Sequence, residues 1–108
     1  MTSESDNPTR RAACLVEGRV QGVWFRKSAQ KVAAELALSG WARNLDDGRV
    51  QVVVEGPERD LVRFIRWVWV GPALARVDHV DVDLGEPTGA EPVFEVRPNA
   101  TADEAVRT

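Results

Sequence analysis

One short stretch of the chain joins two glycines to an arginine at a predicted strand-to-helix junction. Its sequence is Gly18-Arg19-Val20-Gln21-Gly22-Val23-Trp24-Phe25-Arg26. Glycines at 18 and 22 allow positive φ angles, so that successive backbone N–H groups face one point. The helix N-terminus that follows adds partial positive charge, and Arg26 in its first turn adds a planar fork of donors matched to phosphate oxygens. The stretch is therefore predicted to form a small phosphate cradle.

The elements expected around this stretch follow one another without a linker or an internal repeat. Strands are predicted at about 11–17, 40–44, from 50 after the hairpin signal Asp46-Asp47-Gly48, 76–84 and 93–97. Helices are predicted at about 24–36 and from Gly56-Pro57 to Gly71-Pro72, with Pro57 suited to the first helical position. This βαββαβ order with a trailing strand predicts an α+β, ferredoxin-like sandwich. Two helices would cover one face of a mostly antiparallel sheet of four or five strands.

Composition limits the classes of protein that the chain represents. Its 108 residues, 44% hydrophobic and 29% charged, are typical of one globular domain. A net charge of −3 argues against general nucleic-acid binding. No apolar run approaches the ~18 residues of a membrane span, and the polar start lacks a secretory signal. Cys14 is the only cysteine, which fits a reducing cytoplasm.

The two ends of the chain differ from its middle. Residues 1–10 and 99–108 are polar or small and carry no periodicity. They are interpreted as a flexible N-terminal tail and a flexible C-terminal tail around a domain at 11–98.

Two long motifs occur in the chain at a fixed spacing. The first is Val16-x-Gly18-Arg19-Val20-Gln21-Gly22-Val23-x-Phe25-Arg26, and the second is Gly40-Trp41-Ala42-Arg43-Asn44, followed by Gly48-x-Val50 and Glu55-Gly56-Pro57. In both motifs the chain closely resembles the acylphosphatase family, from about residue 12 to 97. The resemblance implies hydrolysis of acyl phosphates to a carboxylate and inorganic phosphate, without metal or cofactor. It further implies that Arg26 and the loop N–H groups of 19–23 bind the phosphoryl group, and that Asn44 orients the attacking water.

The chemistry of such a reaction agrees with the residues present. An acyl phosphate leaves as a carboxylate whose conjugate acid has a pKa of about 4, so no general acid is needed. The stretch from Gly18 to Arg26 indeed contains no Asp, Glu or His. Phosphoryl transfer depends mainly on positioning and charge stabilisation. Cys14 lies twelve residues before Arg26, outside the loop, and is a poor candidate for a nucleophile. Direct attack by water is predicted.

Two other classes of function remain open. One is a non-catalytic module of the same fold that binds phosphate or carbamoyl phosphate, which the presence of both Arg26 and Asn44 disfavours. The other is an RNA-binding ferredoxin-like domain, which needs exposed aromatic residues on its central strands where this chain has Val, Gln, Ala and Leu. Trp24, beside the loop, either lines the pocket for the acyl group or packs against the helix.

Two positions depart from the family's pattern. Ala37 follows the first helix where relatives usually carry glycine, and a left-handed alanine there costs about 1 kcal/mol. Trp67, Trp69 and Val70 make the end of the second helix unusually apolar. We predict a monomer in which Trp69 is partly exposed and supports a weak contact with another molecule.

Overall fold

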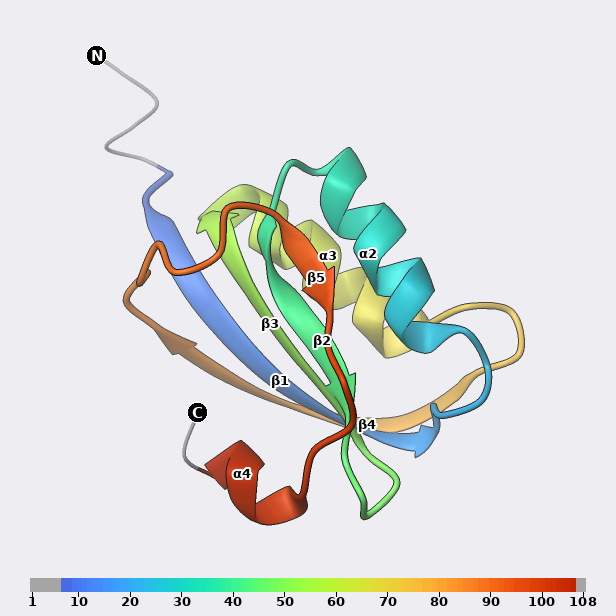
Figure 1. Ribbon diagram of the computed structural model, residues 1–108. Helices are drawn as coiled ribbons and strands as arrows, with labels where there is room; N and C mark the ends of the chain where they lie inside the picture. Colours follow the sequence, from blue (N-terminus) through green and yellow to red (C-terminus); the bar gives the residue numbers. More distant parts are fainter. Residues whose placement is uncertain (1–6, 107–108) are drawn as a thin grey trace.

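Residues 7–106 fold into a five-stranded sheet with two helices packed on one face (Figure 1). The computed structural model describes residues 7–106. The strands are β1 (Thr9–Arg19), β2 (Ser39–Asn44), β3 (Val50–Pro57), β4 (Arg76–Gly85) and β5 (Phe94–Val96), and the helices are α2 (Phe25–Glu35), α3 (Glu58–Val70) and α4 (Ala102–Val106).

The sheet has the strand order β4-β1-β3-β2-β5. Every pair of neighbouring strands is antiparallel except β2 and β5, which run parallel. The predicted ferredoxin-like α+β sandwich is thereby confirmed, with the trailing strand β5 at one edge.

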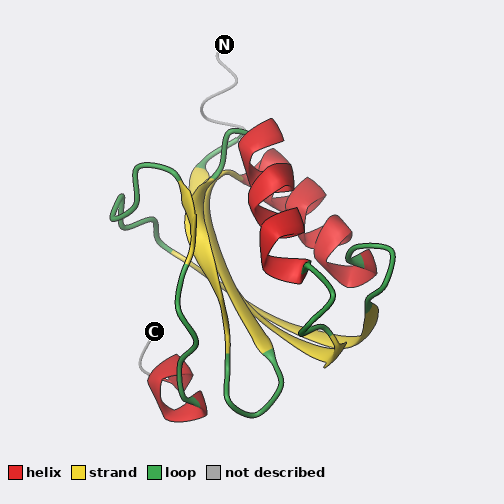
Figure 2. Ribbon diagram, turned by 45° about the vertical axis from the view of Figure 1, so that its right-hand side comes forward, coloured by secondary structure: helices red, strands yellow, loops and turns green. Residues whose placement is uncertain are grey.

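The main core lies between the sheet and the helices α2 and α3, which Figure 2 shows on one side of the strands. On β1 and β3 every second side chain is buried against these helices, because successive side chains of a strand face opposite sides. The predicted helical stripes supply the other half of this core. It comprises Ala12, Cys14, Val16, Val50, Val52 and Val54 from the strands, and Phe25, Ala29, Ala33, Leu61, Phe64 and Val68 from the helices.

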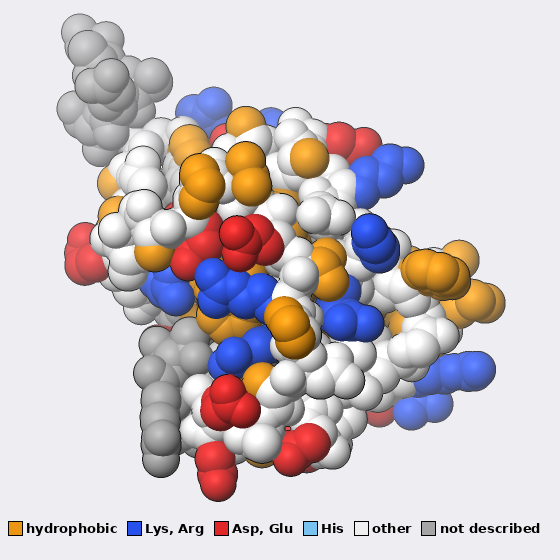
Figure 3. Space-filling model, in the orientation of Figure 1, with side chains coloured by type: hydrophobic (Ala, Val, Ile, Leu, Met, Phe, Trp, Pro, Cys, Tyr) orange, Lys and Arg blue, Asp and Glu red, His pale blue; other side chains and the backbone are white. Residues whose placement is uncertain are grey.

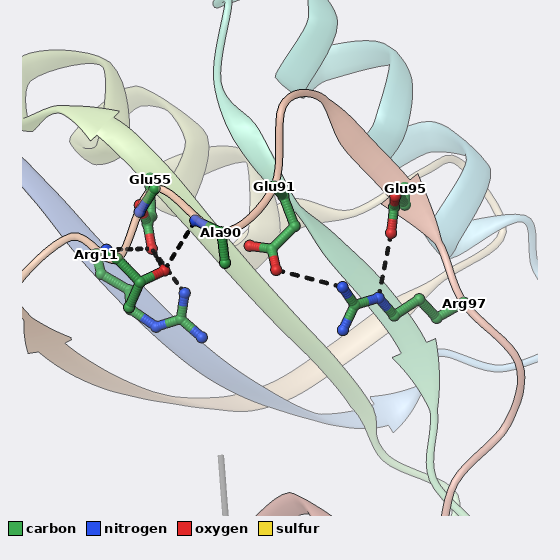
Figure 4. A network of polar contacts seen from close by, with 8 residues as sticks. Arg11, Glu55, Ala90, Glu91, Glu95 and Arg97 are labelled. Atoms are coloured by element: carbon green, nitrogen blue, oxygen red, sulfur yellow. Dashed lines mark hydrogen bonds and ion pairs between the residues drawn. The ribbon is translucent and has the colours of Figure 1, made fainter.

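The opposite face of the sheet is covered by side chains and loops. Trp41 of β2 is 3% exposed because the guanidinium groups of Arg43 and Arg97 lie 4.8 and 4.7 Å from its ring centroid. Arg97 also pairs with Glu91 and Glu95 (Figure 4). In the space-filling view, basic and acidic side chains accordingly lie beside each other over the centre of the molecule (Figure 3).

A buried carboxylate on β3 anchors the loop that leads to β5. Glu55 accepts hydrogen bonds from Arg11, from Thr88 through both its N–H and its hydroxyl, and from the Gly89 N–H. Burial alone would raise the pKa of Glu55. The hydrogen bonds outweigh this effect and lower the pKa to about 2. The carboxylate therefore contributes to stability above the usual carboxyl pKa, and the contribution is lost only as the pH falls towards 2.

Three details differ from the sequence-based expectation. Residues 1–6 of the predicted N-terminal tail lie outside the described residues, whereas Thr9 and Arg10 already belong to β1. Pro57 is the N-cap of α3 with φ −59° and ψ 139°, one residue before the first helical position. The segment from 99 onward, expected to be a flexible tail, pairs with the end of β2 through Ala100 and forms α4. The pairing was not predicted because this segment has no apolar periodicity, and hydrogen bonds between backbone groups need no apolar side chain.

Ala37 ends α2 in the left-handed conformation that the sequence indicated. Its φ is +56°, and the N–H groups of Ala37 and Leu38 donate back to Ala34 and Ala33. This is the hydrogen-bond pattern of a helix end that favours glycine, which has no Cβ penalty at positive φ.

We expect Ala37→Gly to raise the free energy of unfolding by about 1 kcal/mol, because it relieves the left-handed strain. Urea denaturation measures the change. Ala34→Gly is the matched control: this exposed residue has ordinary helical geometry, so glycine should destabilise the protein by about 0.5–1 kcal/mol. Equal effects of the two substitutions would contradict the assigned role of position 37.

Candidate active site

The loop between β1 and α2 takes a shape that its two glycines make possible. Gly18 has φ +132° and follows a bulge between Glu17 and Gly18. A Cβ at position 18 would collide with the carbonyl oxygen of Arg76 on the neighbouring strand. Gly22 has φ +73° and faces open space, with no atom within 4 Å of the place where a Cβ would stand. The sequence-based expectation of positive φ at both positions is confirmed.

Some of the remaining loop residues have buried side chains that anchor the loop, and others have exposed side chains. Val20 and Val23 are 1% and 4% exposed, so their side chains belong to the core and hold the loop in place. Arg19 is exposed at the end of β1, and Trp24 is 70% exposed with a left-handed φ of +67°. A bulky residue rarely adopts this conformation, and such strain is concentrated at functional sites in proteins.

The N-terminus of α2 is left without a negative partner from the described residues. Its N-cap, Trp24, makes no side-chain capping bond, and its first turn contains no acidic residue. Arg26 lies half-buried in this turn, and no ion pair or side-chain hydrogen bond joins it to any residue in the range 7–106. A guanidinium and a helix N-terminus thus place positive charge together without a counter-charge, which favours an anion.

Asn44 ends β2, on the side of the sheet that faces the helices. It pairs with Val50 of β3, and the residue is 9% exposed. Within the described part of the chain its carboxamide has no hydrogen-bond partner, yet its atoms are not sealed from solvent. A nearly buried amide whose polar atoms still reach solvent is suited to hold a water molecule.

Gln21 ties the loop to the strand end that carries Asn44. Its Nε2 donates to the carbonyl oxygens of Leu45 at 2.7 Å and Arg49 at 2.9 Å, on the two sides of the β2–β3 hairpin. Figure 1 shows the loop after β1 and this hairpin at the same end of the sheet. The sequence indicated only a backbone role for Gln21, in the cradle. The one available signal was a polar side chain within a loop of glycines and valines.

Other chemistry is not supported by the residues in this part of the protein. Burial raises the pKa of the Cys14 thiol to about 12, so it stays protonated and unreactive at neutral pH. His79 lies on β4 and pairs with Asp81 instead of reaching the loop. Among residues 7–106, no three His, Cys, Asp or Glu side chains are grouped so that they could hold a metal ion.

Comparison with known proteins places this loop and strand in a family. The sequence model of acylphosphatases matches residues 12–96, which include both motifs. The chain belongs to the acylphosphatase family. An acylphosphatase from Roseiflexus sp. is 48% identical over 86 residues, covering 80% of this chain and 92% of the relative. One from Thermus thermophilus is 56% identical over 79 residues, covering 73% of this chain and 90% of the relative.

The same family appears among solved structures. The crystal structure of acylphosphatase from Bacillus subtilis aligns with a TM-score of 0.79 at 35% identity, covering 82% of this chain and 98% of that protein. The segment after residue 96 lies beyond the match to the acylphosphatase sequence model.

Gln21→Met keeps the length of the side chain but removes both donors to the hairpin. We expect kcat/KM to fall about tenfold, because small misplacements of catalytic groups are costly. The free energy of unfolding should fall by about 1 kcal/mol, because two hydrogen bonds are lost while both carbonyls keep a backbone donor, from Gly48 to Leu45 and from Leu45 to Arg49. Steady-state kinetics and urea unfolding measure the two effects.

Gln30→Met is the matched control for this variant. The Gln30 side chain makes one longer bond, 3.3 Å to the Phe94 carbonyl, away from the loop. The Gln30→Met substitution should therefore leave kcat/KM unchanged. An unaltered kcat/KM in Gln21→Met would show that the bond to the hairpin does not position the site.

Proposed function

We propose that this member of the acylphosphatase family hydrolyses the carboxyl–phosphate bond of acyl phosphates by direct attack of water. Arg26 and the N–H groups of residues 19–23 hold the phosphoryl group, and Asn44 orients the water. The observation that carries the proposal is the Arg26 guanidinium, which has no partner among residues 7–106 and lies at a helix N-terminus without a side-chain cap, after a loop that Gln21 joins to the strand end of Asn44.

The proposed reaction needs only groups that this loop and strand end offer. The phosphoryl oxygens accept hydrogen bonds from Arg26 and from backbone N–H groups of the loop, in which Gly22 has the positive φ typical of anion-binding turns. As the bond from water to phosphorus forms, the bond from phosphorus to the acyl oxygen breaks and its electron pair leaves on the carboxylate. The proton of the water passes to the phosphate or to solvent. A fixed positive site stabilises the charge on the equatorial oxygens without reorganising.

The acyl side of the proposed site is bordered by Trp24. Because this side chain is 70% exposed, it does not pack into the helix core, and the remaining interpretation is that it lies beside the acyl group. A strained backbone that keeps an indole in solvent is consistent with a ligand-contacting role. The products in this scheme are a carboxylate and inorganic phosphate, and no cofactor takes part.

The surroundings of the sheet favour a small-molecule substrate over nucleic acid. Trp41, the aromatic residue of β2, is enclosed between two arginines, and no aromatic residue occurs on β1 or β3. Base stacking on the central strands is therefore unsupported. None of the helices in the described residues has the length and apolarity needed to cross a bilayer. We propose action in the cytoplasm without a membrane or nucleic-acid partner.

Two substitutions separate the proposed roles. Arg26→Ala should cost about 3–5 kcal/mol of phosphoryl binding, because the anion loses its charged partner. Asn44→Ala should lower kcat by about 10²-fold or more with little change in KM, because it removes an interaction used on the way to the transition state. Steady-state kinetics on benzoyl phosphate, with inorganic phosphate as inhibitor, distinguishes the two patterns.

Lys27→Ala, an exposed neighbour in the same turn, serves as control for loss of one positive charge and should bind phosphate nearly normally. Near-normal turnover in Asn44→Ala would refute the role given to that residue. Phosphate binding without any turnover in the natural chain would instead favour the non-catalytic module.

We also propose a monomer with weak self-association through Trp69. This side chain is 46% exposed, meets the His79 ring edge-on at 5.9 Å, and adjoins Val70, which is 70% exposed. Sedimentation velocity should show a slight rise in sedimentation coefficient with concentration, which Trp69→Gln abolishes. A concentration-independent monomer in the natural chain would contradict the contact.

A further inference from the structure

The chain continues past β5 and stays beside β2 as far as the end of that strand. The N–H of Arg97 donates to the Ala42 carbonyl at 2.8 Å, and the N–H of Ala100 donates to the Asn44 carbonyl at 2.9 Å. In return, the N–H of Asp46 donates to the Ala100 carbonyl at 2.9 Å. We call residues 97–102 the C-terminal strap. It extends the parallel pairing of β5 and β2 through a bridge between Leu45 and Ala100.

The far end of the strap is closed by two local contacts. The N–H of Ala102 donates to Asp46 Oδ1 at 2.9 Å, on the hairpin that follows Asn44. Thr101 and Glu104 then cap α4 reciprocally, since the Glu104 carboxylate accepts from the Thr101 N–H and the Thr101 hydroxyl accepts from the Glu104 N–H. The strap is thus held at both ends, and Ala100 between them is buried at 9% exposure.

We propose that the C-terminal strap is a positioning element for Asn44 and acts on the turnover step of the reaction. This inference rests on the proposed role of Asn44 as the residue that orients the water. With β3 on one side and the strap on the other, the backbone of Asn44 lies inside the sheet instead of at an edge. Strand ends without a second neighbour open easily, whereas paired ones stay fixed.

The strap touches only one half of the proposed site. Its hydrogen bonds to β2 and the hairpin go to Ala42, Asn44 and Asp46, and within residues 7–106 none of its hydrogen bonds reaches the loop 19–24 or Arg26. Loosening the strap therefore disturbs the water-orienting amide directly, whereas the phosphate cradle is linked to the strap only through Leu45 and keeps the Gln21 bond to Arg49. The consequence is a fall in kcat without a matching loss of phosphate affinity.

Ala100→Pro tests the strap because proline lacks the N–H that bonds to Asn44. We expect kcat on benzoyl phosphate to fall about tenfold, while KM and the inhibition constant of inorganic phosphate stay within about twofold. Asn99→Pro is the matched control, because Asn99 is exposed and its N–H makes no hydrogen bond within the described residues. A folded Ala100→Pro protein with natural kcat, or one in which phosphate affinity falls as much as kcat, would overturn the proposal.

Asp46→Ala provides a second route that leaves Ala100 intact. It removes the acceptor for the Ala102 N–H and should lower kcat about threefold, whereas Asp46→Asn keeps an Oδ1 acceptor and should restore natural kcat. Equal kcat in the alanine and asparagine variants would contradict a positioning role for the strap.

A double variant separates failure of the strap from failure of the proposed site. In an Asn44→Ala background, Ala100→Pro should lower kcat no further, because the group it positions is gone. If Asn44→Ala has a low kcat and Ala100→Pro lowers kcat further by its own factor, the strap proposal is wrong while the proposed role of Asn44 stands. If Asn44→Ala has a natural kcat, the proposed role of Asn44 is wrong, and the strap has no catalytic group to position.

Discussion

The proposed site depends on one electrostatic constraint, a guanidinium placed where the described residues offer it no counter-charge. Arg26 lies in the first turn of a helix that has no acidic residue and no side-chain cap there. Positive charges held close together cost free energy, and an anion bound between them lowers that cost. The fold maintains this arrangement through buried Val20 and Val23, which fix the loop, and through Phe25 and Ala29, which fix the helix.

The second half of the proposed site depends on backbone pairing. Asn44 contributes through a carboxamide whose position follows from β3 on one side and the C-terminal strap on the other, with Gln21 joining the adjoining hairpin to the loop. These contacts are hydrogen bonds to main-chain carbonyls, so they fix position without adding charge. They allow the charged half and the neutral half of the site to be supported by separate parts of the fold.

Much of this structure could be predicted from the sequence because it follows from local patterns. Alternating residues on β3, the helical stripe of α2 and the glycines at 18 and 22 each determine a conformation by themselves. The left-handed geometry of Ala37 was indicated differently, by the glycine that relatives usually carry at this position. The resemblance in two motifs then identified Arg26 and Asn44 as the residues to examine.

The remainder could not be predicted because it depends on contacts between distant segments. The two bonds of Gln21 span 24 and 28 residues, and no local pattern specifies such partners. The strap was not predicted, because a segment of small and polar residues can pair through its backbone without any hydrophobic periodicity in its sequence. Its one local signal was Thr101 followed three residues later by Glu104, a capping box before a helix too short to show periodicity.

The most direct test of the central claim is a crystal structure of the protein with inorganic phosphate bound. We expect phosphate oxygens at hydrogen-bond distance, about 3 Å, from the Arg26 guanidinium and the N–H groups of the 19–23 loop. We also expect the Asn44 carboxamide within reach of a water beside the same phosphorus atom. Phosphate bound elsewhere, or Arg26 and Asn44 facing separate regions with no shared anion between them, would contradict the account.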